Sequence, residues 1–212
     1  LNALSGFSSI LTEETNDNET RQQCSDIILQ NSELLLKLIN DVIDLSNLEV
    51  GKMAFNYEQC DAVAICRNVI DMVEKIKQTN AEVRFSSILQ SLQLTTDNAR
   101  LQQLLINLLI NATKFTPQGT ITLELEKQTE DTALFSVTDT GCGIPKDHQN
   151  KIFNRFEKLD ENAQGTGLGL SICQLIIEQL GGKIWIDPDY NQGARFLFTH
   201  PINKQVRKED IA

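Results

Sequence analysis

Residues 20–49 carry apolar side chains at alternating spacings of four and three, which is the repeat of a helix that packs along a seam. The seam positions are Cys24, Ile28, Asn31, Leu35, Leu38, Val42 and Leu45. Ile27, Leu34 and Ile39 widen this apolar face beyond what a two-stranded coiled coil buries. The pattern therefore predicts a bundle of more than two helices.

A short amphipathic helix is predicted before the long one, because Leu4, Phe7 and Leu11 lie three and four residues apart. The polar residues 15–19 are the predicted turn of a helical hairpin. One hairpin cannot enclose a core with so wide an apolar face. Two chains are therefore expected to pair their hairpins into a four-helix bundle, which predicts a homodimer.

The helical pattern stops at residues 49–52, and the rest of the chain mixes helices with strands. Asp61 is a plausible N-cap for one of these helices. The expected strands are 53–57, 83–87, 92–95, 120–128, 132–138, 183–187 and 193–199, and the expected helices are 61–78, 98–115 and about 170–180. No strict alternation of strand and helix is present. The fold class predicted is α+β, in which the helical hairpin precedes an α/β sandwich with a mixed sheet covered on one face by helices.

Composition excludes several classes of protein. The chain has 19 Lys and Arg against 29 Asp and Glu, a formal net charge of −10, which argues against a general nucleic-acid binder or direct contact with an anionic membrane. No run approaches the roughly 18 apolar residues of a membrane-spanning helix, and the N-terminus lacks the order of a secretory signal. A cytoplasmic chain, or a cytoplasmic piece of something larger, is expected.

The cysteines point to the same compartment. They are five, an odd number without a CxxC pair, at Cys24, Cys60, Cys66, Cys142 and Cys173. We expect reduced thiols that fill small apolar sites.

Two asparagines and a lysine share one face of the predicted helix 98–115. Asn107 and Asn111 lie four residues apart, and Lys114 follows three further on, among apolar neighbours. Asparagine is costly inside such a helix unless its amide finds a partner. The functional interpretation is oxygen ligation of a hard cation such as Mg²⁺, with Lys114 near a phosphate. The alternative is a pair of structural asparagines that cap loops.

A carboxylate beside two glycines follows the strand that ends at residue 138. In the sequence DTGCGIP, Asp139 could accept a hydrogen bond from the amino group of a flat ligand whose ring lies over the backbone of Gly141 and Gly143. The same residues could instead form a turn that needs positive φ.

A second glycine-rich sequence, GTGLGLS, leads directly into the last predicted helix. Glycines let backbone N–H groups approach an anion, and a helix N-terminus adds partial positive charge. It matches neither the P-loop nor the dinucleotide-binding fingerprint. Just upstream, Phe153 and Phe156 flank Arg155, and residues 158–164 could form a mobile cover over the ligand. The alternative for the two phenylalanines is ordinary core contacts.

Taken in order, N-x3-N-x2-KF, DTGCGIP, F-x2-F and GTGLGLS resemble the ATP-binding catalytic domain of sensor histidine kinases, within the gyrase, heat-shock-chaperone and histidine-kinase ATPase superfamily. The resemblance covers about residues 53–200. Upstream, residues 1–7 are similar to the segment after the family's histidine-bearing box, and residues 44–49 to the end of the second dimerisation helix. Three domains are expected: a dimerisation hairpin at 1–50, an ATP-binding domain at 51–202 and a polar tail at 203–212.

The resemblance implies ATP and Mg²⁺ as ligands and assigns roles to particular residues. Asn111 would ligate Mg²⁺ with support from Asn107, and Lys114 would neutralise phosphate charge. Phe115 would pack on the adenine, and Asp139 would accept from its amino group, directly or through water. The resemblance further implies that Gly141 and Gly143 allow close approach to the base, that Ile144 forms an apolar wall, that Lys158 faces the γ-phosphate, and that the phosphates are lined by Gly165, Thr166, Gly167, Leu168 and Gly169. Asn107, Lys114 and Lys158 would be the catalytic set.

The chain departs from the family at the phosphoacceptor, which would lie a few residues before Leu1. Its two histidines, His148 and His200, lack the helical context of an acceptor, so we do not expect the chain to phosphorylate itself. The resemblance otherwise implies transfer of the γ-phosphoryl to a histidine on a dimerisation helix, relay to the receiver domain of a response regulator, and a parent protein anchored in the inner membrane. Two alternatives remain. One is a degenerate nucleotide-binding scaffold. The other is an ATP-hydrolysing enzyme, although Asn107 stands where those enzymes carry a glutamate base.

Overall fold

The computed structural model of the chain describes residues 18–50, 54–158 and 166–203. It contains two compact units, Leu1–Asp44 and Leu45–Ala212. The predicted short helix around residues 4–11 and the tail from residue 204 onward lie outside the described residues.

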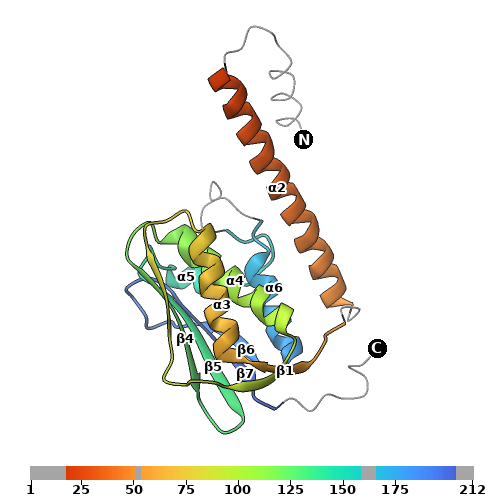
Figure 1. Cartoon of the computed structure of the whole chain (residues 1–212), viewed down its shortest axis with the longest axis vertical. Helices are drawn as coiled ribbons and strands as arrows, with labels where there is room; N and C mark the ends of the chain where they lie inside the picture. Colours follow the sequence, from red (N-terminus) through yellow and green to blue (C-terminus); the bar gives the residue numbers. More distant parts are fainter. Residues whose placement is uncertain (1–17, 51–53, 159–165, 204–212) are drawn as a thin grey trace. The chain divides into compact units, whose positions relative to one another are not determined.

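The predicted long helix is confirmed as α2, Asn18–Glu49 (Figure 1). It begins inside the stretch that we predicted to be a turn, because Asn18 and Glu19 are already helical. Glu19 in the first turn suits the positive end of the helix dipole. Many apolar side chains of α2 are exposed in the single chain, namely Leu29, Leu35, Leu36, Ile39, Val42 and Ile43.

The second unit is built on a five-stranded sheet with the strand order β2-β4-β5-β7-β6. Its strands are β2 (Glu82–Ser86), β4 (Thr120–Lys127), β5 (Thr132–Asp139), β6 (Lys183–Ile186) and β7 (Arg195–Pro201). The β2–β4 pair is parallel and the other pairs are antiparallel, so the predicted mixed sheet is confirmed. Strand β7 begins two residues later than predicted, after Gly193 and Ala194.

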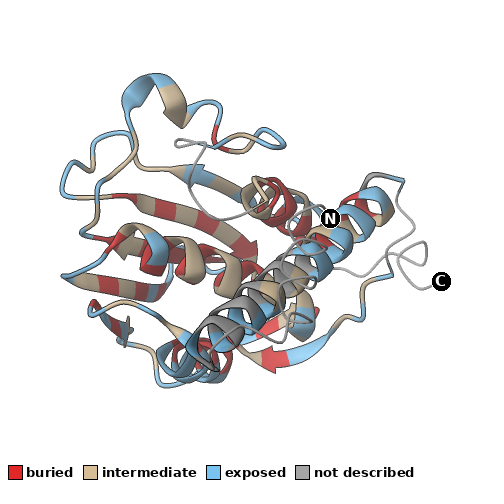
Figure 2. Cartoon of the chain, turned by 90° about the horizontal axis from the view of Figure 1, so that it is seen from above, coloured by how far each residue is buried: buried red, intermediate tan, exposed pale blue. Residues whose placement is uncertain are grey.

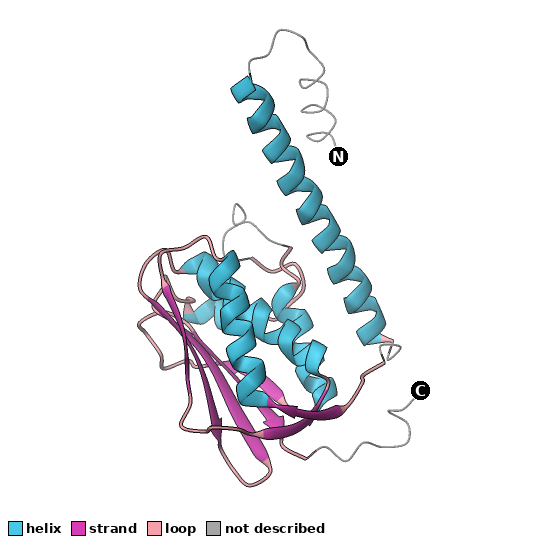
Figure 3. Cartoon of the chain, in the orientation of Figure 1, coloured by secondary structure: helices cyan, strands magenta, loops and turns pink. Residues whose placement is uncertain are grey.

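Three helices cover one face of this sheet, as predicted (Figures 1 and 3). They are α3 (Ala62–Ile76), α4 (Asn98–Phe115) and α6 (Gly169–Leu180), and α4 packs against both of the others. Alternate residues of the strands point into the core between the two layers, which gives the banded burial in Figure 2. At its centre the rings of Phe135 and Phe198 stack at 4.6 Å between centroids.

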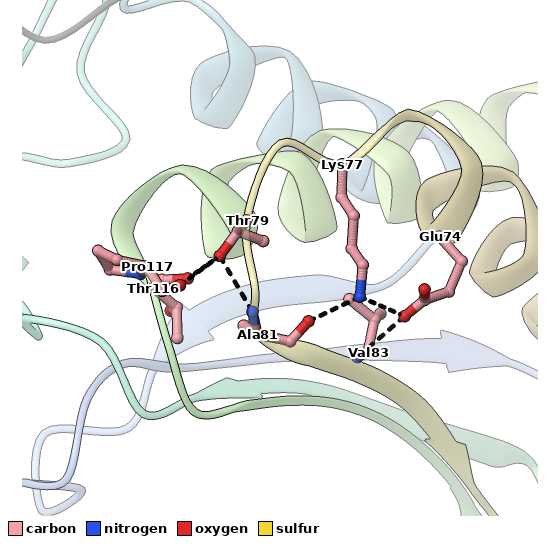
Figure 4. Close-up of polar contacts among 7 residues, drawn as sticks. All are labelled: Glu74, Lys77, Thr79, Ala81, Val83, Thr116 and Pro117. Carbon is pink, nitrogen blue, oxygen red and sulfur yellow. Dashed lines mark hydrogen bonds and ion pairs between the residues drawn. The ribbon is translucent and has the colours of Figure 1, made fainter.

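The sequence accounts for where α3 and α4 begin and end. Asp61 caps α3 by accepting from Val63 N at 3.0 Å, and Asp97 caps α4 by accepting from Arg100 N at 3.0 Å. Helix α3 ends two residues before the predicted boundary. Lys77 leaves the helix there, and its Nζ bonds Glu74 and the carbonyl of Ala81, each at 2.7 Å (Figure 4).

Two expectations about local structure are wrong, and one short element was not predicted. Residues 54–57 form no strand, because the N–H of Asn56 donates to Asp97 Oδ2 at 2.8 Å instead of to a neighbouring strand. The strand begins later, as β1 (Glu58–Asp61), and pairs with β3 (Gln93–Thr96) in a separate two-stranded sheet. A short helix, α5 (Lys146–Gln149), was not predicted, since four residues are too few to show a helical period.

The second wrong expectation concerns a cysteine. Cys60, Cys66 and Cys173 are buried free thiols, as expected, but the Cys142 thiol is exposed to solvent in the loop after β5. The side chain of Cys24 lies outside the described residues.

Candidate functional site

Asp139 ends β5 as a buried carboxylate with 4% exposure. Its Oδ1 accepts from Gly141 N at 2.8 Å and from Ala194 N at 3.2 Å. Burial raises the pKa of Asp139, while these two N–H groups and the nearby Thr116 hydroxyl act in the opposite direction and offset only part of that rise. A buried carboxylate that is held in this way can accept a further hydrogen bond from only one defined direction.

The glycine loop after Asp139 lies directly on the C-terminal end of α4. Cys142 N donates to the Phe115 carbonyl at 3.3 Å. A Cβ added at Gly141 would lie 2.2 Å from that same carbonyl oxygen, so only glycine fits at this point. The fold therefore brings the backbone of Phe115 against the loop that contains Gly141 and follows Asp139. Ile144 follows as a half-buried side chain that packs against the core.

The loop between β6 and β7 completes the surroundings of Asp139, and the sequence analysis missed it. The Tyr190 hydroxyl donates to the Asp139 carbonyl at 3.2 Å. A Cβ at Gly193 would lie 2.1 Å from that carbonyl oxygen, so this glycine lets the loop reach the end of β5. Thr116, Tyr190, Gly193 and Ala194 were all missed. The sequence offers only the two small residues Gly193 and Ala194 before a strand with alternating polarity, and this pattern does not indicate a contact with Asp139.

The polar face of α4 is present as predicted. Asn107 and Asn111 are half-buried and Lys114 is exposed. The Lys114 ammonium lies 4.8 Å from the centroid of the Phe115 ring. This places a cation beside the aromatic predicted to pack on the base.

The second glycine sequence leads into α6. Thr166 Oγ1 accepts from Leu168 N at 3.2 Å, and the Leu168 side chain is completely buried in the core. Gly169 opens α6, and an added Cβ there would meet nothing within 4 Å. Helix α6 packs on α4, where Cys173 Sγ lies 3.7 Å from the Leu104 carbonyl. The glycine sequence thus leads into a helix that lies beside the helix with the two asparagines. Gly165 is outside the described residues.

The two phenylalanines of F-x2-F have different environments. Phe153 is half-buried and meets Phe196 edge-on at 6.3 Å, which is the ordinary core contact given above as the alternative. Phe156 is 64% exposed and has a φ of 61°, which is unusual for a bulky residue. Its N–H donates to the Gly167 carbonyl at 2.9 Å, which ties it to the glycine sequence. Lys158 is exposed, and residues 159–164 lie outside the described residues.

The side chains present suit Mg²⁺ only in combination with a phosphate ligand. Among residues 18–50, 54–158 and 166–203, no three His, Cys, Asp or Glu side chains are grouped to hold a metal. The half-buried amides of Asn107 and Asn111 offer neutral oxygen ligands of the kind that a hard cation accepts. Phosphate oxygens would supply the negative charge.

Two family models match the chain. Residues 96–204 match the family described as histidine kinase-, DNA gyrase B- and HSP90-like ATPase, and residues 1–51 match the His Kinase A (phospho-acceptor) domain. The chain belongs to the sensor histidine kinases. The first of these matches begins just before α4 and covers Asp139 and α6, so the residues of the candidate site lie within it.

Curated histidine kinases are similar to this sensor histidine kinase chain over most of its length. The circadian input-output histidine kinase CikA of Synechococcus elongatus is 36% identical over 195 residues, which are 86% of this chain and 25% of CikA. The autoinducer 2 sensor kinase/phosphatase LuxQ of Vibrio vulnificus is 32% identical over 216 residues, 96% of this chain and 25% of LuxQ. The chain thus spans about a quarter of the length of these relatives.

Solved structures agree with the kinase fold. Full-length ShkA in complex with AMPPNP superposes with a TM-score of 0.78 at 27% identity, over 97% of this chain and 44% of ShkA. ThkA in complex with the response regulator TrrA superposes with a TM-score of 0.77 at 27% identity, over 96% of this chain and 58% of the other. In the described part of the kinase chain, every helix is too short or too polar to cross a membrane.

Proposed function

We propose that the chain binds ATP with Mg²⁺ at the site around Asp139 and delivers the γ-phosphoryl to a histidine on a dimerisation helix. The observation that carries this proposal is the buried carboxylate of Asp139, whose Oδ1 is held by Gly141 N and Ala194 N. Its second oxygen is left to accept from the amino group of adenine. The match to a family of ATPases and the complex of ShkA with AMPPNP support the binding of a nucleotide.

The polar residues have separate roles in this proposal. Asn111 and Asn107 would hold Mg²⁺, which when bound neutralises phosphate charge. Lys114 and Lys158 would offset charge on the β- and γ-phosphates, and Gly165, Thr166, Gly167, Leu168 and Gly169 would line them from the start of α6. The unprotonated ring nitrogen of that histidine would attack the γ-phosphorus with its lone pair as the bond to the bridging oxygen breaks and ADP leaves, and the other ring nitrogen would then release its proton to solvent. Such a transfer needs positioning and charge neutralisation more than covalent help.

Neither histidine of the chain is the acceptor in this proposal. His200 is completely buried on β7, where its Nε2 bonds Thr96 Oγ1 at 2.9 Å. His148 lies on the four-residue α5 and faces Asp147 at 3.6 Å. A histidine on a dimerisation helix is therefore required, and the phosphohistidine would pass its phosphoryl to the receiver domain of a response regulator, as the partner in the ThkA complex suggests.

The exposed apolar side chains of α2 support a dimer. Leu29, Leu36 and Ile43 recur every seven residues, and all three are at least half exposed. Together with the other exposed apolar side chains of α2, they form a wide face that is buried when two hairpins form a four-helix bundle. We therefore propose that the chain dimerises through residues 1–50 and that residues 51–202 bind the nucleotide.

Calorimetric titration with ADP and AMPPNP, with and without Mg²⁺, tests the nucleotide site. We expect saturable binding that Mg²⁺ strengthens and that Asp139→Asn weakens, while the exposed control Asp131→Asn binds normally. Absence of binding in the unchanged chain would contradict the proposal. Transfer is tested by joining a histidine-bearing first helix to the chain and following acid-labile label from γ-labelled ATP, with the same helix carrying glutamine as control. Release of free phosphate without labelled protein would favour the hydrolytic alternative.

A further inference from the structure

The two carboxylate oxygens of Asp139 differ in their contacts. Both backbone donors, Gly141 N and Ala194 N, go to Oδ1. No backbone N–H of the described residues reaches Oδ2. The carboxylate is therefore fixed by one oxygen, and the other is set apart for a ligand.

The Thr116 hydroxyl lies beside this carboxylate. Thr116 is completely buried at the end of α4, and within the described part of the chain its Oγ1 makes no hydrogen bond. A Cβ added at Gly141 would lie 2.7 Å from this Oγ1, so the hydroxyl faces the glycine loop. It also lies close enough to Asp139 to lower the pKa of that carboxyl, although it does not reach it with hydrogen-bond geometry. A buried hydroxyl without a partner is costly, which indicates a use that arises in another state.

The backbone of Thr116 is anchored from a different part of the domain. The Thr79 hydroxyl, in the loop between α3 and β2, donates to the carbonyls of Thr116 and Pro117, as Figure 4 shows. The same Thr79 oxygen accepts from Ala81 N at 3.2 Å. These bonds hold the backbone of Thr116 in place.

We propose that Thr116 is a positioning residue for base recognition, whose hydroxyl donates to the Asp139 carboxylate when a nucleotide binds. The inference rests on the proposed nucleotide site. The donated bond keeps the carboxylate ionised in its buried position, so that it accepts from the amino group of a 6-aminopurine. Bonds of this kind are often loose in the free protein and tighten in the complex. Thr116 therefore acts on the base through Asp139, because its own atoms are covered.

Other polar groups near Asp139 do not replace this donor. Tyr190 donates to the backbone carbonyl of Asp139 and not to its carboxylate. Arg195 on β7 pairs with Asp187 at 3.6 Å and bonds Thr138 Oγ1 at 3.1 Å. Burial, the two backbone N–H groups and Thr116 are what act on the pKa of Asp139.

Three variants separate hydroxyl from packing. Thr116→Val keeps the shape and removes the hydroxyl, and Thr116→Ser keeps the hydroxyl and removes the methyl group. Thr113→Val is the matched control, because Thr113 is buried on the same helix but its hydroxyl bonds the Ile110 carbonyl at 2.9 Å. Affinity for ADP and for inosine diphosphate, a 6-oxopurine, is measured by calorimetry across pH, and thermal unfolding is followed in each variant.

We expect Thr116→Val to weaken ADP binding about tenfold or more and to shrink the preference for ADP over inosine diphosphate. Its ADP binding should also fail at a higher pH on acidification, because the pKa of Asp139 rises further without the donor. Thr116→Ser should retain the ADP affinity, the preference for ADP over inosine diphosphate and the pH profile of the unchanged chain. Without ligand and at acidic pH, where Asp139 is protonated, Thr116→Val should unfold no earlier than the unchanged chain, since it then loses only an unpartnered hydroxyl.

Equal ADP affinity and pH profile in the unchanged chain and Thr116→Val would overturn the inference and leave the nucleotide site intact. A loss in Thr116→Ser as large as in Thr116→Val would assign Thr116 to packing and would also overturn it. Failure of the unchanged chain to bind ADP would instead refute the proposed function.

Discussion

The backbone N–H of Ala194 donates to Oδ1 of Asp139 at 3.2 Å, across 55 residues of sequence. This bond joins the segment before the last strand to the end of β5. Together with the N–H of Gly141 it holds Oδ1 and leaves Oδ2 without a donor from the backbone of the described residues.

Asp139→Asn should weaken ADP and ATP binding by about 1–3 kcal/mol, roughly 5- to 150-fold. The two backbone donors will hold the amide oxygen at the Oδ1 position, so the amide NH₂ takes the place of Oδ2 and faces the adenine amino group with a donor. Calorimetry with Asp131→Asn as control measures the effect. Undiminished affinity would mean that Asp139 does not contact the base.

Acidification should separate the binding and the stability roles of Asp139. Its pKa is raised in the folded chain by burial, so ADP binding should be lost as pH falls through a range above that of an ordinary aspartate. Acidification has the opposite effect on folding. Because the pKa of Asp139 is raised in the folded chain, the ionised carboxyl lowers the free energy of unfolding at neutral pH. This penalty disappears as the pH falls and the carboxyl becomes protonated. Asp139→Asn without ligand should therefore melt later than the unchanged chain at pH 7, and the gap should close on acidification. A constant gap in thermal melts would contradict this.

Two glycines of the second glycine sequence should respond differently to alanine. Gly167 has a φ of 72°, and an added Cβ would lie 2.8 Å from the Phe156 backbone, whereas Gly169 has open space. Gly167→Ala should destabilise the chain by about 1–2 kcal/mol or more. Gly169→Ala should leave the melting temperature unchanged or raise it, because alanine is the better helix residue.

Nucleotide affinity then shows what Gly169 is for. If its missing side chain makes room for a phosphate, Gly169→Ala will lose ATP affinity without losing stability. Equal affinity would indicate that the phosphates do not approach this residue.

Asn111→Ala should remove most of the gain in AMPPNP affinity that Mg²⁺ provides and leave the affinity in Mg²⁺-free buffer unchanged. The physical reason is that the Asn111 amide oxygen would ligate the metal rather than the base. Asn68→Ala, an exposed asparagine on α3, is the control. A loss of equal size with and without Mg²⁺ would show that Asn111 contacts the nucleotide itself.

Cys142 should be the reactive thiol among the described cysteines. Its side chain is exposed in the glycine loop, whereas burial raises the pKa of Cys60 to about 11 and that of Cys66 to about 12, so both stay protonated at pH 8. In a Cys24→Ser background, a disulfide reagent should modify one thiol in the native protein, and saturating ADP should slow the reaction. A rate that ADP does not change would separate Cys142 from the nucleotide site.

Leu36→Lys should convert a dimer into a monomer of 23.8 kDa, which light scattering would measure. Leu36 is 61% exposed in the single chain, and a charge placed in the proposed bundle core would be left without a partner. Asn40→Lys, at an exposed polar position of the same helix, should remain dimeric. An unchanged mass for Leu36→Lys would place the interface elsewhere.

Local patterns were sufficient to predict most elements of this fold. The apolar period of 3.6 and the capping residues Asp61 and Asp97 mark α3 and α4, and the alternation of period two marks β4 and β5. The ordered motifs also identified the family. These features depend on neighbours in sequence, and their physical cause lies in hydrogen bonds and side-chain periodicity within a few residues.

The surroundings of Asp139 were decided by tertiary structure alone. Thr116 follows α4 and Ala194 precedes β7, and nothing in their own segments indicates that they lie beside a carboxylate. The expected strand at 53–57 failed for the same reason, since the N–H of Asn56 is taken by Asp97, 41 residues away. Sequence determined most of the helices and strands, because helical hydrogen bonds, capping contacts and side-chain periodicity are local. Which oxygen of Asp139 is free, and which hydroxyl lies beside it, depended on contacts that exist only after the layers have packed.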